Sequence, residues 1–303
     1  MPINPARRRF IKFGAVATTL LSAAAPAATL ARSVAAAKNG AGTDGYVDVG
    51  VMLRYHLSRR AGPPMVLLHE MGMNHEAWAD VAAGLERDHT VLRYDLRGFG
   101  RSEKFTGSVT FDDHINDLTA LLAATGLTGP VVLVGAALGG ALALKFAVAH
   151  PGKVRAVVAL SPALGAVSGK PATANPSADA MVRDGPRAWV MPRMADPEFD
   201  KMKINPRRFA DFVGWNLAND PHSWAATMRM VSAATFADVY GQVRCPVLMV
   251  GAGGFQGRPV ASIQAAAAQI PRGEFLLLNA GHFMAYDSPE LVVPAIRKYM
   301  SRV

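Results

Sequence analysis

A tight turn between a strand and a helix constrains this chain more than any other feature of its sequence. Residues 131–140 read VVLVGAALGG, a β-branched run that meets two glycines four positions apart, Gly135 and Gly139. The alanine-rich stretch ALALKFAVAH follows and is typical of a helix. Both glycines are needed because the turn is so tight that a side chain at either position would collide with its neighbours. The residue in the middle of the turn is Ala137.

Strand and helix patterns alternate along most of the chain. Residues 46–57 alternate polar and apolar side chains, which predicts an opening hairpin. Continuous apolar runs of the kind buried in parallel sheets predict strands at 65–68, 90–94, 131–134, 154–160, 246–250 and 274–278. Helical spacing lies between or after them, at 111–125, 259–270 and 289–300. The order predicts an α/β fold with a doubly wound, mostly parallel sheet, whose ligands bind beyond the carboxyl ends of the strands.

One long segment breaks this alternation. Residues 162–240 are rich in Pro, Met, Trp and Arg and contain no strand pattern. The position of this segment, between two predicted strands, indicates a helical cap inserted into the sheet domain. We therefore expect residues 46–303 to form one domain with its own cap.

Charge and cysteine content exclude several classes of function. The formal charge of +9 is uneven, because six of the 32 basic residues and none of the 23 acidic ones lie in residues 1–38. The remainder is close to neutral and has no basic stripe, so we expect no nucleic-acid partner. Cys245 is the only cysteine, no metal-ligand spacing is present, and the glycine cluster at 251–254 lacks the spacing of a phosphate loop. The sequence predicts neither a metal nor a cofactor, only a small-molecule substrate.

The first 38 residues have the pattern of an export signal. A basic start, R-R-R-F-I-K at 7–12, precedes the apolar stretch FGAVATTLLSAAA and small-residue cleavage candidates at 23–25 and 35–37. The pattern resembles a twin-arginine signal, which predicts a bacterial periplasmic protein. Pro26 interrupts a run that is already too short and too diluted for a membrane span. We predict a removable signal over 1–38, a flexible join over 39–45, and no membrane span after removal.

Four ordered motifs resemble the α/β-hydrolase family, in particular its epoxide-hydrolase and enol-lactonase branch. They are H-x-x-G at His69, D-x-R-G-x-G-x-S at 95–102, the glycine turn at 135–139 and A-G-H at 280–282. In that family the turn is a nucleophile elbow, usually G-x-S-x-G. The resemblance covers about residues 46–301.

The resemblance assigns roles that this chain fills only in part. His282 matches the family histidine, but the nucleophile position is Ala137 and the expected acid position is Gly254. The oxyanion hole is built from backbone N–H groups, here those of Met71 and Leu138, so it does not depend on the missing side chains.

One further departure suggests a different acid. The family usually has glycine after the loop histidine, and this chain has Glu70. A carboxylate there would repel an oxyanion unless it were protonated or turned to act as an acid or base with His282. Residues near the predicted site that are candidates for lining a pocket are His69, His75, Trp78, Phe99, Trp189, Trp215 and Trp224.

Ala137 has three interpretations. Coordinated departures at Glu70, Ala137 and Gly254 favour a natural branch with altered chemistry. Its His282 and Glu70 would activate water or move a proton on a small, largely apolar carbonyl compound (an ester, a lactone or a carbon–carbon bond), without a serine acyl-enzyme. The alternatives are a non-catalytic binding protein and an engineered serine-to-alanine variant of an esterase or lactonase. Neither the substrate nor the oligomeric state follows from the sequence.

Overall fold

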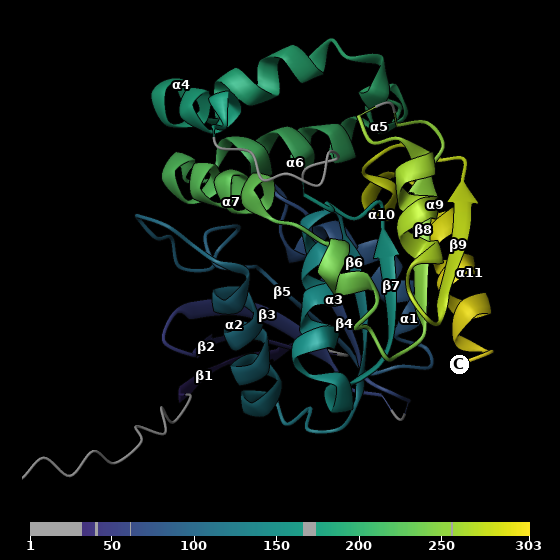
Figure 1. The fold of residues 1–303 in the computed structure, drawn as a ribbon. Helices are drawn as coiled ribbons and strands as arrows, with labels where there is room; N and C mark the ends of the chain where they lie inside the picture. The colour runs from purple at the N-terminus through teal and green to yellow at the C-terminus, as the bar shows by residue number, and fades with distance from the viewer. Residues whose placement is uncertain (1–31, 40–41, 61, 166–173, 256) are drawn as a thin grey trace, which may run out of the picture.

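A nine-stranded sheet organises the computed structural model, which describes residues 32–39, 42–60, 62–165, 174–255 and 257–303 (Figure 1). Its strand order is β1-β2-β3-β5-β4-β6-β7-β8-β9. The first three strands are antiparallel to their neighbours, and the six from β5 to β9 are parallel. The strands are β1 (Arg32–Asn39), β2 (Gly42–Asp48), β3 (Met52–Ser58), β4 (Met65–Leu68), β5 (Val91–Tyr94), β6 (Val131–Ala136), β7 (Val154–Leu160), β8 (Val247–Ala252) and β9 (Gly273–Leu278).

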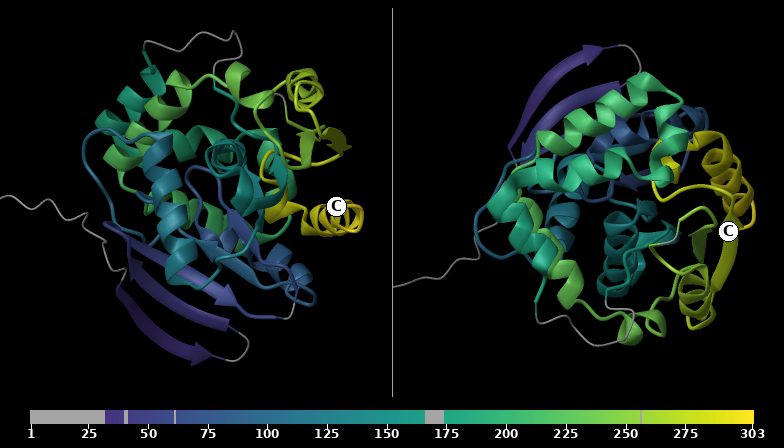
Figure 2. Two further views of the ribbon diagram at one scale, coloured as in Figure 1. Left: turned by 60° about the horizontal axis from the view of Figure 1, so that its bottom comes forward. Right: turned by 90° about the horizontal axis from the view of Figure 1, so that it is seen from above.

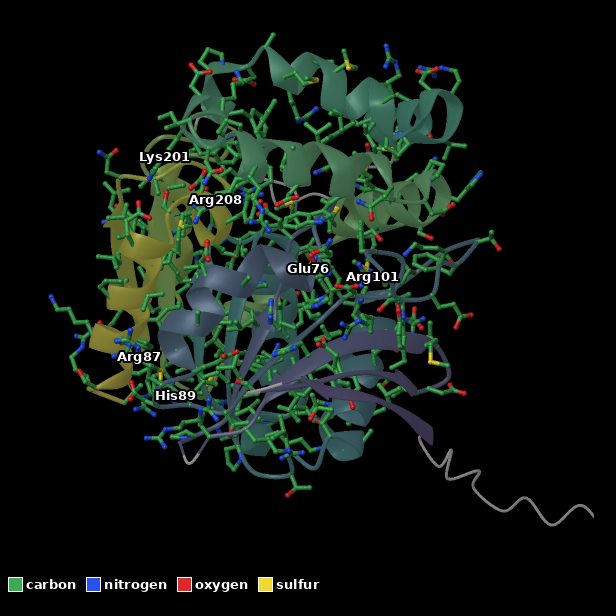
Figure 3. All side chains as sticks on the ribbon, turned by 180° about the vertical axis from the view of Figure 1, so that it is seen from behind. Glu76, Arg87, His89, Arg101, Lys201 and Arg208 are labelled. Atoms are coloured by element: carbon green, nitrogen blue, oxygen red, sulfur yellow. The ribbon has the colours of Figure 1, made fainter. Side chains whose placement is uncertain are left out.

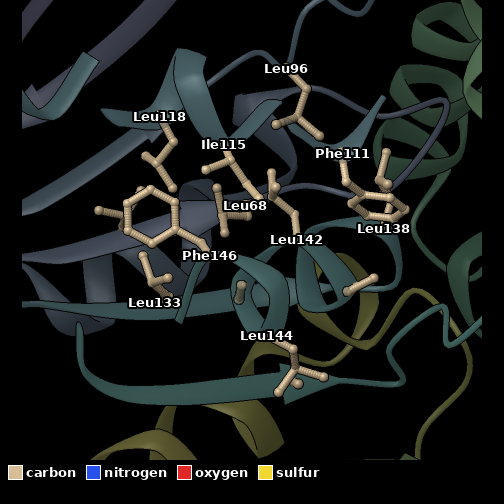
Figure 4. Packing of buried hydrophobic residues seen from close by; sticks show 14 of the residues in the cluster. Leu68, Leu96, Phe111, Ile115, Leu118, Leu133, Leu138, Leu142, Leu144 and Phe146 are labelled. Carbon is tan, nitrogen blue, oxygen red and sulfur yellow. The ribbon is translucent and has the colours of Figure 1, made fainter. Parts of the chain in front are cut away.

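Helices cover both faces of the parallel part. Alternate strand residues point to opposite faces, so Leu133 packs in one apolar cluster and Val132 in another. The first cluster includes α2 (Phe111–Ala124), α3 (Leu138–Ala149) and α9 (Val260–Ala268), and Figure 4 shows Leu142 and Phe146 of α3 in it. The second includes α1 (Ala79–Leu85) and α11 (Pro289–Met300). Short helices precede α1 (η1, His75–Trp78), follow α3 (η2, Pro151–Lys153) and precede α11 (α10, Met284–Asp287). The predicted doubly wound fold is confirmed.

The predicted cap is present between β7 and β8. It contains α4 (Pro176–Met194), η3 (Pro197–Phe199), α5 (Asp200–Lys203), α6 (Pro206–Leu217), α7 (Pro221–Ala233) and α8 (Ala237–Tyr240). The helices α4, α6 and α7 lie over the end of the sheet to which the strand arrows point (Figures 1 and 2). Non-helical backbone at Gly185 (φ 71°, ψ 179°) interrupts α4, so its two halves run in different directions.

Polar contacts fasten the cap to the sheet domain. Arg208 of α6 pairs with Asp80 of α1 and donates at 2.8 Å to the carbonyl oxygen of Tyr286. Lys201 of α5 lies 3.2 Å from a carboxylate oxygen of Glu290. Both cations lie at the boundary between cap and sheet domain in Figure 3. These contacts hold the cap above the carboxyl ends of the parallel strands.

The structure differs from the sequence prediction at the N-terminus. Residues 1–31 of the predicted signal lie outside the described residues, but Arg32–Asn39 form β1, which pairs with β2 from Arg32↔Asp48 to Asn39↔Gly42. The predicted join over 39–45 is therefore strand at Asn39 and at 42–45, because 42–45 pair with β1 on one side and β3 on the other. The hairpin predicted at 46–57 is confirmed as β2 and β3. None of the described helices is long and apolar enough to cross a membrane.

A buried histidine in α2 makes stability depend on pH. His114 is 1% exposed, and neither ring nitrogen has a hydrogen-bond partner among the described residues. Burial, aided by the Arg97 guanidinium, lowers the pKa of His114 to about 3. An unfolded histidine has a pKa of about 6.5. The stability that depends on the neutral ring is therefore present above that value and is lost as the pH falls toward 3.

We expect His114→Leu to increase the free energy of unfolding at pH 5 by about 2 kcal/mol more than at pH 7, because leucine removes the proton uptake on unfolding. Urea unfolding followed by circular dichroism at both pH values measures the difference. The exposed His222 supplies a matched control, since His222→Leu should leave the pH dependence unchanged. Equal pH dependence in His114→Leu and the parent protein would contradict this account.

Candidate active site

Four loops at the carboxyl ends of parallel strands meet at one cavity beneath the cap. Glu70 follows β4, Ala137 follows β6, Arg258 lies beyond β8 and His282 lies beyond β9. The cavity has a volume of about 180 Å³, and all four residues line it. The site is therefore at the edge of the sheet where the sequence predicts ligands to bind.

The turn at Ala137 has the geometry of a nucleophile elbow. Ala137 has φ 44° and ψ −106°, a backbone conformation that is unfavourable for residues with a side chain. Its N–H donates to the carbonyl oxygen of Leu160 at 2.9 Å, and its carbonyl accepts from Ala141 at 3.0 Å. The backbone passes so close to itself that a Cβ on Gly135 would lie 2.2 Å from the carbonyl carbon of Gly139. The elbow is fully formed, although its side chain is a methyl group.

The close approach at the elbow predicts a large effect of a single methyl group. A Cβ on Gly139 would lie 2.1 Å from the carbonyl oxygen of Leu68 in β4. We expect Gly139→Ala to lower the free energy of unfolding by about 3 kcal/mol, because backbone on both sides would have to move. Gly152→Ala is the control, since a Cβ there meets nothing within 4 Å. Urea unfolding compares the two, and equal stability in both variants would contradict the tight contact between the elbow and β4.

Glu70 and His282 form a direct polar pair. The carboxylate Oε2 of Glu70 lies 3.1 Å from the ring Nε2 of His282, and the two side chains are 5% and 15% exposed. Burial, aided by the guanidinium groups of Arg258 and Arg193, lowers the pKa of His282 to about 3. The imidazole is thus neutral near pH 7, and a single proton between Oε2 and Nε2 is enough to make the hydrogen bond.

The other ring nitrogen of His282 faces no acid. Nδ1 is buried and has no hydrogen-bond partner among the described residues. At the position of the family acid, the N–H of Gly254 donates to the carbonyl of Ala280 at 2.9 Å. The next residue, Phe255, stacks its ring on the imidazole with centroids 4.3 Å apart. An aromatic ring therefore holds the imidazole, and the pair has its carboxylate on the Nε2 side, where a serine hydroxyl would lie in the usual triad.

The predicted oxyanion hole lies at the same cavity. Met71 lines it, and Leu138 is the first residue of α3. An N–H in the first turn of a helix has no acceptor within the helix, and the helix dipole adds positive potential there. The role of the two amides stays a prediction, and the geometry of the elbow is compatible with it.

Three residues predicted to line the pocket have other roles. His69 is 1% exposed, accepts at Nε2 from the N–H of Leu96 at 2.9 Å and donates from Nδ1 to the carbonyl of Glu70 at 2.8 Å. Trp78 and Phe99 are buried in the two sheet clusters. None of the three lines the cavity. The prediction is wrong for them because a position near a strand end does not reveal which way a side chain turns.

The remaining candidates divide between the cavity and the surrounding structure. Trp189 and Trp224 of the cap line the cavity, with ring centroids 5.0 Å apart. Trp215 lines a different, polar hollow that also includes His75. Asp95 is buried and accepts from the His75 ring at 2.6 Å and from the Arg101 N–H at 2.7 Å, so it holds its loop together.

Sequence reasoning missed two cationic residues of the cavity. Arg258 lies beyond β8 and Arg193 lies in the last turn of α4, and both line the cavity with Glu70 and His282. No motif marks either residue, since each reaches the site only through the path of its loop or helix. The only signal was the arginine content of the cap sequence, which concerns Arg193, because Arg258 lies outside the cap. Among the described residues, no cluster of side chains suited to a metal ion is present.

Comparisons with known proteins agree with the fold described above. A model of the alpha/beta hydrolase family matches residues 65–295. A 2-hydroxy-6-oxo-6-(2'-aminophenyl)hexa-2,4-dienoic acid hydrolase of Metapseudomonas resinovorans is 31% identical over 121 residues, which cover 39% of this chain and 42% of that protein. A pimeloyl-[acyl-carrier protein] methyl ester esterase of Salmonella heidelberg is 36% identical over 109 residues, covering 35% and 40%. The matches thus span less than half of these relatives.

Solved structures are similar over most of the chain. A thermophilic esterase from Thermogutta terrifontis, with malate bound, has a TM-score of 0.73 at 25% identity and covers 83% of this chain and 94% of its own. The enol-lactonase from Burkholderia xenovorans LB400 has a TM-score of 0.76 at 22% identity, covering 83% and 97%. At that identity the likeness shows the fold alone.

Proposed function

Because the chain belongs to the alpha/beta hydrolase family, we propose that it hydrolyses a small ester or lactone with water activated by Glu70 and His282, without a serine acyl-enzyme. The observation that supports this most directly is the composition of the cavity. Among the described residues that line it, none is serine, threonine or cysteine, and the Glu70–His282 pair is the group suited to general acid–base chemistry.

The attacking water would bind in the cavity beside Ala137, which has no hydroxyl. In the usual triad the histidine Nε2 takes a proton from the serine oxygen at the elbow. Here Ala137 presents only a methyl group to the cavity, and the carboxylate of Glu70, which lines the same cavity, contacts the same Nε2. A water molecule bound there would lie within reach of both the pair and a substrate carbonyl.

The proposed reaction balances without a further reagent. The pair removes one proton from water as the water oxygen bonds to the carbonyl carbon, and the carbonyl electron pair moves onto its oxygen. The N–H groups of Met71 and Leu138 stabilise that oxyanion. The carbon–oxygen bond to the leaving group then breaks, and the departing alkoxide takes the proton back from the pair. An acid and an alcohol result, and the enzyme returns to its starting state.

The test is covalent labelling. We expect a fluorophosphonate probe to leave the mass of the protein unchanged, because the described residues that line the cavity carry no hydroxyl. Acid quenching during turnover of small p-nitrophenyl esters should likewise trap no acyl-enzyme detectable by intact-mass spectrometry. Stoichiometric labelling of a serine, or an acylated protein in the quench, would overturn the proposal. Turnover absent for every ester and lactone tested would favour the non-catalytic binding protein instead.

The export prediction belongs to this proposal as well. A twin-arginine signal over the first residues would deliver a folded hydrolase to the periplasm. Cleavage after residues 23–25 would keep β1 in the mature protein, whereas cleavage after 35–37 would remove it. The pairing of β1 with β2 at Arg32–Ala35 and at Lys38 and Asn39 supports the first site in this proposal.

A further inference from the structure

Two arginines from distant parts of the chain line the cavity that holds Glu70 and His282. The guanidinium of Arg258 donates to the carbonyl oxygen of Ser161 and, at 3.1 Å, to its hydroxyl oxygen. The guanidinium of Arg193 lies 3.7 Å from the centroid of the Trp189 ring, and its Nη1 donates to the Trp189 carbonyl at 2.9 Å. These contacts hold both cations in place at the wall, so neither needs to be ordered when a ligand arrives.

The charges of the cavity do not cancel. Glu70 is the only acidic residue among the described residues that line it, against two arginines. Burial chiefly lowers the pKa of His282 and keeps that ring neutral, and both guanidinium groups are close enough to add to the effect. Burial lowers the pKa of Arg258 to about 10, so it remains cationic at neutral pH. With Glu70 ionised, the described residues that line the cavity sum to one positive charge, in surroundings that screen it poorly.

The rest of the wall is aromatic or apolar and the space is small. Trp189, Trp224, Phe199, Phe283 and Met228 are among its lining residues. The cavity volume of about 180 Å³ is slightly larger than the roughly 150 Å³ cavity that accommodates benzene in a protein core. A single ring with a short substituent is therefore the size that fits.

We propose that this cavity binds a small monoanion, an aromatic or branched aliphatic carboxylate whose carboxylate group lies against Arg258 and Arg193. The proposal deepens the proposed function, on which it rests only in naming the substrate class: an ester or lactone that bears a free carboxylate. Carboxylate binding itself requires no turnover. Guanidinium groups suit this ligand because their N–H donors match the two oxygens of a carboxylate.

Binding of phenylacetate and of phenylacetamide, which have the same shape but differ in charge, tests the proposal. Isothermal titration and tryptophan fluorescence report binding, since Trp189 and Trp224 line the cavity. We expect phenylacetate to bind at least about tenfold more tightly than the amide, as a charge-assisted hydrogen bond permits. Arg258→Met should abolish that preference, and Arg258→Lys should restore part of it. Arg187→Met, an exposed change on the same helix as Arg193, should preserve it.

Phenylacetamide also distinguishes a loss of charge recognition from a structural disturbance of the cavity. If Arg258→Met only disturbed the loop near Ser161, both ligands would weaken equally and their ratio would persist, which would overturn the assignment. Equal affinity for acid and amide in the parent protein would overturn it too, as would no binding by a panel of benzoate, phenylacetate and 3-methylbutanoate. Carboxylate binding in a protein that hydrolyses nothing would leave this inference standing and refute only the proposed function.

Discussion

Glu70→Gln is expected to lower kcat for the hydrolysis of small esters by a factor of about 10² to 10⁴, the usual contribution of a general acid–base group. Glutamine keeps the shape and can still meet Nε2 of His282 across the 3.1 Å contact. It cannot take up a proton. The change therefore removes the chemistry of the pair while leaving its packing intact.

His282→Ala should cause a loss of the same size, and the double variant should be little slower than either single one. Residues that act as one unit show such non-additive losses. The measurement is steady-state kinetics on p-nitrophenyl esters, with near-ultraviolet circular dichroism to verify the fold. Glu76→Gln, a change at a partly exposed carboxylate in η1, is the control and should keep kcat within about twofold. Multiplicative losses in the double variant, or full activity in either single one, would exclude the paired mechanism.

The second large effect is a gain of function at the elbow. Ala137→Ser alone should react only slowly with a fluorophosphonate, because Glu70 already occupies the ring nitrogen that would activate the serine. Glu70→Gly frees Nε2, and Gly254→Asp supplies an acid in the loop beside His282, where the buried Nδ1 has no partner among the described residues. A Cβ on Gly254 would lie 3.2 Å from the Ala280 carbonyl oxygen, a tight contact that small shifts relieve.

The triple variant Glu70→Gly/Ala137→Ser/Gly254→Asp is expected to be labelled at least about 10²-fold faster than Ala137→Ser, since the triad gains both its base and its orienting acid. Intact-mass spectrometry over time measures the rate, and peptide mapping locates the label at position 137. Glu70→Gly/Gly254→Asp, which lacks the hydroxyl, should remain unlabelled. Fast labelling of Ala137→Ser alone would show that Glu70 does not block the base, and would favour the interpretation of the chain as an engineered esterase variant.

The sequence predicted the sheet and the cap correctly because both depend on local patterns. Apolar runs ending in motifs mark parallel strands, and the strandless segment at 162–240 marks an insertion. The contact of Glu70 with His282 was one of the alternatives that the family resemblance left open, and it is the one observed. The sequence did not predict side chains that reach the cavity through the path of a single loop or helix. Arg193 reaches the cavity after the interruption of α4 at Gly185, and Arg258 reaches it through the loop beyond β8.

The backbone at Ala137 retains a conformation that costs on the order of 1–3 kcal/mol, although the methyl group it presents is inert. The bend places Leu138 at the first position of α3, where its N–H has no acceptor within the helix. The group that we propose stabilises the oxyanion is thus a backbone N–H and not a side chain. Any small residue that tolerates the positive φ at position 137 would preserve this N–H. Position 137 can therefore vary in sequence while the positive potential at the start of α3 is kept.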